Sequence, residues 1–147
     1  MNPIDKLIFV SNLPAADKLL FIEAVFTSAY VRFTLCFLSF KKVLNWLGKA
    51  NESKKNDAFL SVETVKKTEM AVRRCNTYTP WKTECYTQAL TGKILLQRRH
   101  INSTLYIGLM KDENACYKGH AWLKANDFFV TGYNNRLQQF QVHSFFS

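Results

Sequence analysis

Apolar and polar residues alternate with a helical period over the first two thirds of the chain and with a strand-like period over the last third. The longest apolar run covers residues 19–40 and reads LLFIEAVFTSAYVRFTLCFLSF. Pro14 and Asp17 precede or open it, and both residue types are favoured where a helix starts. We therefore expect a helix from about Pro14 to about Leu47, with a break near Ser39.

A polar stretch, KANESKKNDA at residues 49–58, is the one candidate linker. The segment after it, SVETVKKTEMAVRRC, has apolar residues at helical spacing and Ser61 in position to cap the helix start. The following NTYTPWK should end this helix, because a residue before proline is pushed towards extended geometry. A further helix is expected from TECYTQAL, residues 83–90, to about Arg99.

Beyond that helix the apolar residues alternate with a period of two. Residues 103–111 are expected to form a strand, followed by a turn at KDENA. Residues 116–133 are typical of a hairpin that turns at residues 125–127, and residues 140–146 of a last strand. Helices followed by an antiparallel sheet predict an α+β fold, with residues 1–60 as an N-terminal helical region and linker and residues 61–147 as the core.

Length and charge narrow the classes of partner. The 147 residues suit one domain with a real core, and the net charge of +9 suits an acidic partner. Lysine and arginine are spread along the chain and are not interleaved with aromatic residues, so we expect no nucleic-acid binding. An acidic peptide partner and a surface that is simply basic are equally compatible with this charge.

The apolar run at residues 19–40 is long enough to cross a bilayer. It contains Glu23 and Arg32, and a central arginine costs about 2.5 to 3.5 kcal/mol on insertion scales. We therefore expect a buried or docking helix in preference to a transmembrane span, with a surface-lying amphipathic helix as the alternative. The start, MNPIDKLIFV, has no export-signal pattern, so we expect a cytoplasmic protein.

The four cysteines, Cys36, Cys75, Cys85 and Cys116, lie far apart and form no CxxC pair. This spacing argues against a zinc site and against a disulfide framework. We expect free thiols, no metal and no cofactor.

Cys85 is the candidate nucleophile. If Thr83 caps the helix, Cys85 is its second residue, where the positive end of the helix dipole favours a thiolate. A nucleophilic thiol also needs a base, and His120 in GHAW is better placed than His100 at a helix end or His143 in the tail. The alternative is a small buried cysteine and a hydrogen-bonded core histidine without chemistry.

A cysteine at a helix start, then a strand, then a hairpin with a histidine is the order of a papain-like or transglutaminase-like core. The sequence resembles the transglutaminase-like maturation proteases of lasso-peptide gene clusters, closely over residues 78–147 and more loosely before them. The motifs that carry the resemblance are Pro80-Trp81, Gln88-Ala89, Ile107-Gly108 and His120-Ala121-Trp122.

The resemblance implies a cysteine peptidase that cuts the leader from a ribosomally made lasso-peptide precursor before macrocyclisation, with Cys85 as nucleophile and His120 as general base and acid. It also implies a separate leader-recognition protein, since no fused recognition domain fits before residue 60, and an ATP-dependent lasso cyclase that closes the ring. Two alternatives remain. The same Cys-His pair could carry acyl transfer to an amine, or the chain could be a non-catalytic scaffold for the cyclase.

Many relatives carry an aspartate about twelve residues after the histidine, where this chain has Gly132. Asp127 is a poor substitute, because the hairpin places it at the turn while His120 should face Gly132 or Tyr133. The group that orients His120 is left unassigned among a backbone carbonyl, Asn134 and Asn135.

Two tryptophans flank the candidate residues. Trp81 and the Cys85 amide are candidates for stabilising an oxyanion, although Trp81 suits the core equally well. Trp122 is expected to pack beneath His120.

Overall fold

The computed structural model describes residues 8–46, 50–51, 61–81 and 83–147. Its helices are α2 (Ala15–Phe37), α3 (Phe40–Asn45), α4 (Val62–Tyr78) and α5 (Cys85–Gln97), with a short 3-10 helix η1 (Leu137–Gln139). Its strands are β1 (Thr104–Lys111), β2 (Tyr117–Ala125), β3 (Phe128–Thr131) and β4 (Gln141–Phe146). Helices come before an antiparallel sheet, so the α+β prediction is confirmed.

The expected break in the first helix is present. α2 ends at Phe37 because Leu38 and Ser39 adopt extended backbone angles, and α3 starts again at Phe40. The continuation to Leu47 and the expected linker, apart from residues 50 and 51, lie outside the described residues. The proposed division after residue 60 also falls there and stays a prediction.

α4 begins as expected, because the Ser61 hydroxyl accepts a hydrogen bond from the Thr64 amide at 3.3 Å. Its predicted end was too early, since the helix continues through Tyr78. Pro80 restricts only the residue directly before it, and only Thr79 takes the extended conformation. The three residues of NTY therefore remain helical.

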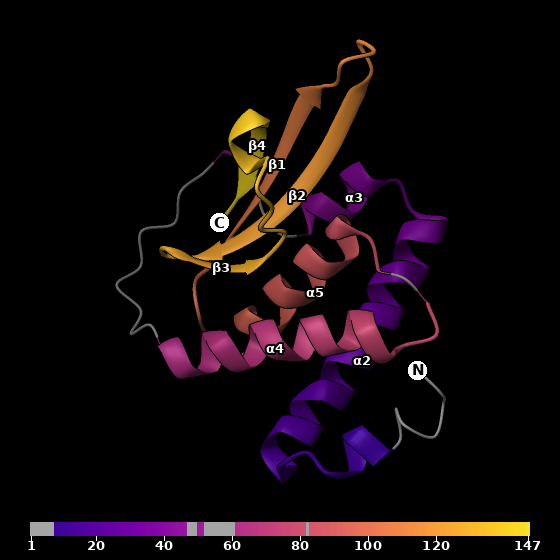
Figure 1. Ribbon diagram of the computed structural model, residues 1–147, viewed down its shortest axis with the longest axis vertical. Coiled ribbons are helices and arrows are strands. Elements are labelled where there is room, and N and C mark those ends of the chain that lie inside the picture. Colours follow the sequence, from indigo (N-terminus) through magenta and orange to yellow (C-terminus); the bar gives the residue numbers. More distant parts are fainter. Residues whose placement is uncertain (1–7, 47–49, 52–60, 82) are drawn as a thin grey trace.

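α5 is the central element. It lies between the sheet and the pair α2 and α4 (Figure 1), and it packs against both sides. Ala89, Leu90 and Leu96 join the core that covers the sheet, whereas Leu95 joins a second cluster with α2 and α4. A helix buried on several sides cannot shift without disturbing both clusters, so its N-terminus is held firmly in place.

The four strands have the order β3-β2-β1-β4, and every neighbouring pair is antiparallel. The turn between β2 and β3 lies at Asn126 and Asp127, where the hairpin was expected. A bulge between Leu123 and Lys124 shifts the pairing, so that Leu123 lies opposite Thr131. Directly after the end of β3, the Gly132 carbonyl lies beside the His120 ring, as expected.

Candidate active site

Cys85 is the first residue of α5, one position closer to the helix N-terminus than expected. The residue that precedes the helix is Glu84, with extended backbone angles, and Thr83 is not the cap. The Glu84 side chain makes no capping hydrogen bond, and the Cys85 side chain is half-buried. The thiol therefore lies beside first-turn N–H groups that no side chain caps, in the positive end of the helix dipole.

Thr83 has a different role, because it anchors the loop that leads into α5. The Asn76 side-chain oxygen on α4 accepts hydrogen bonds from the Thr83 amide at 3.2 Å and from the Thr83 hydroxyl at 2.6 Å. The Gln88 side-chain NH₂ group donates to the Thr83 carbonyl at 2.8 Å. Earlier in the loop, the Thr79 hydroxyl lies between two carbonyl acceptors, Cys75 at 2.7 Å and Trp81 at 3.0 Å.

The sequence reasoning missed Asn76 entirely and gave Gln88 no role. Asn76 lies seven positions before the residue that it holds. Its contact with Thr83 exists only because the chain turns a corner between α4 and α5. No spacing or motif in the sequence marks such a contact.

The His120 ring is half-buried on β2, and two aromatic side chains frame it. Its centroid lies 6.1 Å from the nearly parallel Trp122 ring and 5.2 Å from the Phe140 ring. Trp122 is buried and also stacks on Tyr106, with centroids 5.6 Å apart. The expected packing of Trp122 against the histidine is confirmed.

Two polar groups reach the same nitrogen of His120. Its Nε2 lies 2.7 Å from the Gly132 carbonyl oxygen and 3.1 Å from the Asn134 side-chain nitrogen. The Asn134 oxygen accepts from the Arg136 amide at 2.8 Å, which fixes the orientation of this side chain. These contacts make opposite demands, since a carbonyl needs a donor and an amide nitrogen needs an acceptor.

We assign the proton to Nε2, because the Gly132 contact is the shorter and a carbonyl oxygen can only accept. In that tautomer Nδ1 carries the lone pair and is the basic atom. The backbone carbonyl and Asn134 are two of the candidates considered for orienting His120. Asp127 is exposed at the hairpin turn, as expected.

Gly132 has no room for an acidic side chain. Its φ angle of 78° is one that residues with a side chain rarely adopt. A Cβ at this position would lie 2.7 Å from Trp122 Cα and would also meet the Ala121 carbonyl oxygen. The tight approach of this glycine to β2 lets its carbonyl reach His120.

The structure brings the surroundings of Cys85 and His120 together. The Tyr86 hydroxyl lies against Gly119, so the residue after the cysteine contacts the residue before the histidine. Burial raises the pKa of Tyr86, as do the nearby charges of Cys85 and Glu84, which keeps its phenol neutral.

The side chains themselves do not yet meet. Cys85 packs at the edge of the core cluster that contains Ala121, and the His120 ring lies with Trp122 on the other side of that strand. Within the described part of the chain, no hydrogen bond joins Cys85 Sγ to His120. Contacts of this kind often tighten only when substrate binds, and proton transfer between these two side chains would require such a rearrangement.

The other cysteines and histidines are poor candidates. Cys75 is buried, its thiol points to the Ala24 carbonyl at 3.8 Å, and burial raises its pKa, which disfavours a thiolate. The remaining cysteines and histidines are exposed away from any nucleophile–base arrangement, namely Cys36, Cys116, His100 and His143.

A pocket of about 210 Å³ lies between α4, α5 and the β3 segment. Asn76, Gln88 and Gly132 all line it, so it borders the groups that hold the Cys85 loop and the His120 ring. Among the described residues, the buried Trp81 indole N–H has no hydrogen-bond partner. Also within the described residues, no cluster of three or more His, Cys, Asp or Glu side chains could hold a metal ion.

Comparison with known proteins gives one match. The family model described as "Transglutaminase-like superfamily" matches residues 28–144, which is most of the chain. No curated protein and no solved structure gives a significant match.

Proposed function

The chain belongs to the transglutaminase-like superfamily, which indicates a cysteine protease or acyltransferase type of function, and from that premise we propose that it removes the leader peptide from a lasso-peptide precursor. The observation that carries the proposal is the placement of Cys85 at the first residue of α5, where no described side chain caps the helix, while the next residue, Tyr86, reaches Gly119 beside His120. The specific substrate class rests on the sequence resemblance.

In the proposed acylation step, the Cys85 thiolate attacks the carbonyl carbon of the last leader residue. The tetrahedral intermediate collapses, the peptide C–N bond breaks, and a thioester forms between leader and enzyme. The leaving amine of the core peptide takes a proton from the protonated His120.

Deacylation uses the same two side chains, and His120 now accepts a proton where it donated one during acylation. His120 Nδ1 accepts a proton from a water molecule as that water attacks the thioester carbonyl. The C–S bond breaks, and the leader leaves with a free carboxyl group. The protonated His120 and the Cys85 thiolate are thereby restored for the next cycle.

The Gly132 carbonyl takes the place that an acidic side chain fills in many relatives. Its oxygen fixes the tautomer and lies towards the positive charge that forms when Nδ1 is protonated. A neutral carbonyl stabilises an imidazolium less than a carboxylate does. The proposed enzyme therefore works with a Cys-His dyad and a backbone orienting group.

The backbone N–H groups at the start of α5 are the proposed donors to the oxyanion of the intermediate. No side chain caps this helix start in the described residues, so these donors are available. The unpartnered Trp81 indole N–H, earlier in the loop that leads into α5, is a second proposed donor.

The proposed partners are the precursor peptide, a separate leader-recognition protein that presents the leader in trans, and the ATP-dependent lasso cyclase that acts on the released core. The proposed site of action is the cytoplasm, where a catalytic thiol stays reduced. A basic chain is suited to an acidic peptide, since its net charge is +9.

The test is product analysis. The purified chain is incubated with a candidate precursor, with and without the recognition protein, and the products are identified by mass spectrometry. Hydrolysis gives a leader with a free carboxyl group and an intact core peptide.

The same measurement separates the alternatives. A leader joined to an added amine would identify an acyltransferase. An unchanged precursor with the recognition protein present, together with faster ring closure when the cyclase is given separately prepared core peptide, would identify a scaffold. Cys116→Ala, at an exposed cysteine outside the site, is the matched control for loss of a thiol at Cys85.

A further inference from the structure

α2 carries a continuous apolar stripe on the side that faces solvent. Its members recur at steps of three or four residues over about 27 Å, and lie within roughly 80° of the helix circumference. Each is between 42% and 73% exposed. They are Leu19, Ile22, Phe26, Tyr30, Phe33 and Phe37, and we call them the α2 stripe.

The opposite side of α2 already has its partners. Leu20, Phe21 and Ala24 are buried against α4 and α5, and Val31 is buried in the cluster that covers the sheet. The α2 stripe is therefore not the core face of this helix. Exposed apolar surface of this extent on a folded domain indicates a docking surface.

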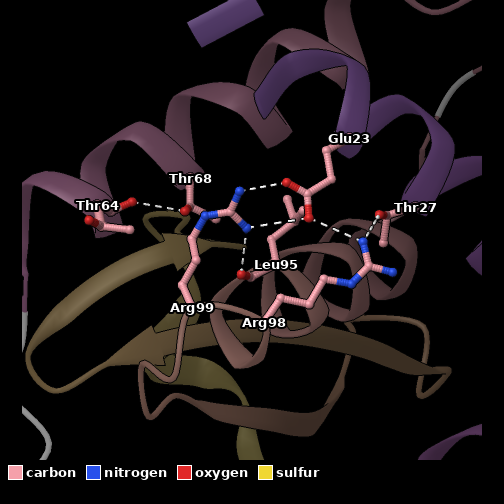
Figure 2. A network of polar contacts seen from close by, with 7 residues as sticks. All are labelled: Glu23, Thr27, Thr64, Thr68, Leu95, Arg98 and Arg99. Carbon is pink, nitrogen blue, oxygen red and sulfur yellow. Dashed lines mark hydrogen bonds and ion pairs between the residues drawn. The ribbon is translucent and has the colours of Figure 1, made fainter. Parts of the chain in front are cut away.

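Both acidic residues of α2 are neutralised on its inner side. Glu23 accepts hydrogen bonds from Arg99 at 2.5 Å and from Arg98 at 3.1 Å, as Figure 2 shows. Asp17 lies 3.4 Å from Arg74. α2 thus presents no uncompensated carboxylate beside the stripe, on a chain with a net charge of +9.

We propose that the α2 stripe docks this protein on the surface of an anionic lipid bilayer, with α2 lying flat at the boundary between headgroups and acyl chains. Four of its six members are aromatic, and Phe, Leu and Tyr side chains favour that boundary. The positive charge of the chain complements anionic headgroups.

Other placements of α2 fit less well. By length and composition α2 could also cross a membrane, but a spanning α2 would leave the arginine partners of Glu23 and the clusters that it completes. A second copy would bring together two chains that each carry a net charge of +9. An anionic bilayer surface satisfies both the apolar stripe and the charge.

The test is flotation of the purified full chain with vesicles of phosphatidylcholine and phosphatidylglycerol in equal parts, and with vesicles of phosphatidylcholine alone. We expect flotation with the anionic vesicles and at least tenfold weaker binding to the neutral ones. Raising the salt from 0.1 to 0.5 M should weaken binding several-fold, because screening reduces the attraction.

A pair of charge-matched double variants isolates the stripe. Phe26→Glu with Phe33→Glu should lower binding at least tenfold. Tyr117→Glu with Val142→Glu, at exposed positions on the sheet, should bind within about threefold of wild type, allowing for the same change in net charge. Circular dichroism and melting curves check that both remain folded.

Phe26→Trp gives a readout that does not depend on a disruptive change. Its added fluorescence, taken as the difference from wild type, should shift to the blue on anionic vesicles and be quenched by brominated lipid.

Several results would overturn the proposal. They are absence of flotation, equal binding to neutral vesicles, equal loss in both double variants, and an unshifted fluorescence signal from the Phe26→Trp variant. A dimer in solution that Phe26→Glu with Phe33→Glu dissociates, without vesicle binding, would assign the stripe to a second copy instead. None of these readouts uses peptidase activity, so they test the docking of α2 independently of the proposed function.

Discussion

The carbonyl oxygen of Gly132 holds the His120 ring, and a backbone group cannot be deleted by substitution. What can be tested is whether this site would accept the acid found in many relatives. The positive φ angle and the contact with Trp122 leave no space for a side chain at residue 132.

We expect Gly132→Asp to destabilise the protein by about 2 to 4 kcal/mol, because it combines backbone strain with overpacking. Leader removal should fall as well, since the displaced carbonyl would release the His120 ring. Urea unfolding and cleavage rates measure the two effects. Tyr133→Asp, which introduces the same residue at the next, exposed position, is the control, and a Gly132→Asp enzyme faster than wild type would contradict the assignment.

Asn76 is a positioning residue for the Cys85 loop. We expect Asn76→Ala to lower kcat about tenfold with a smaller change in KM. The variant keeps the Cys85 thiol but loses the two hydrogen bonds that hold the loop before it. Stability should fall by about 1 to 2 kcal/mol, the usual cost of a lost hydrogen-bond pair.

Asn76→Asp keeps the accepting oxygen and should recover most of the rate. Thr77→Ala removes a hydroxyl from the neighbouring position of α4 and should leave kcat unchanged. If Asn76→Asp were as slow as Asn76→Ala, the accepting oxygen would not be the source of the effect.

Residue types and their order predicted Cys85 at a helix start, His120 on a strand and the packing of Trp122, because helix starts, strand periods and aromatic neighbours are local features. The N-cap of α5 was predicted one residue too early, at Thr83 where the structure has Glu84. The Thr83 hydroxyl donates to Asn76 on α4 across the connection between α4 and α5. The contact between His120 Nε2 and the Gly132 carbonyl crosses a hairpin with a bulge, and no local pattern in the sequence marks that bulge.

At the scale of elements, Glu23 clamps α2 to the end of α5. Figure 2 shows its carboxylate between Arg98 and Arg99, with Arg99 also donating to the Leu95 carbonyl at 2.8 Å. The Arg99 hydrogen bond is the main cause that holds the pKa of Glu23 below its usual value of 4.5, against the opposing effect of burial.

A lowered pKa in the folded state means that the unfolded chain binds the proton more tightly. The stabilisation from Glu23 is therefore complete above about pH 4.5 and is lost as the pH falls through the lower folded value. We expect Glu23→Gln to lower stability by about 1 kcal/mol at pH 7 and to reduce the loss of stability between pH 5 and pH 3.

Urea unfolding of wild type and variant across that pH range measures this. Glu63→Gln, in an exposed pair with Lys67 on α4, is the control and should leave the unfolding midpoint at pH 7 unchanged within error. A Glu23→Gln protein with the same pH dependence as wild type would contradict the clamp.

The periodicity of the sequence predicted every described α-helix and strand from α2 to β4, because each has one regular buried face or a clear turn signal. It could not predict how deeply α5 is buried. Lys93, in the middle of that helix, is 1% exposed and donates to the Ser103 carbonyl at 2.6 Å. From sequence alone a lysine is expected at the surface, because a buried lysine needs a hydrogen-bond acceptor that only the fold can provide.

The whole molecule has a transglutaminase-like fold in which, among the described residues, no acidic side chain bonds His120, and the proposed function requires partners. The pocket beside Gln88 and Gly132 is small, and a leader peptide in trans would gain most of its affinity elsewhere. We expect the recognition protein to raise kcat/KM for the precursor at least tenfold, mainly through a lower KM. Steady-state rates with and without that protein measure this, and equal rates would contradict the split arrangement.

The most direct test of the central claim is intact-mass analysis of acid-quenched reactions with precursor and recognition protein. We expect a leader–enzyme thioester on wild-type protein, none on Cys85→Ala, and leader removal by Cys85→Ala at least a thousandfold slower. Cys116→Ala should behave as wild type. Leader removal by Cys85→Ala at the wild-type rate would contradict the role of Cys85 as the nucleophile.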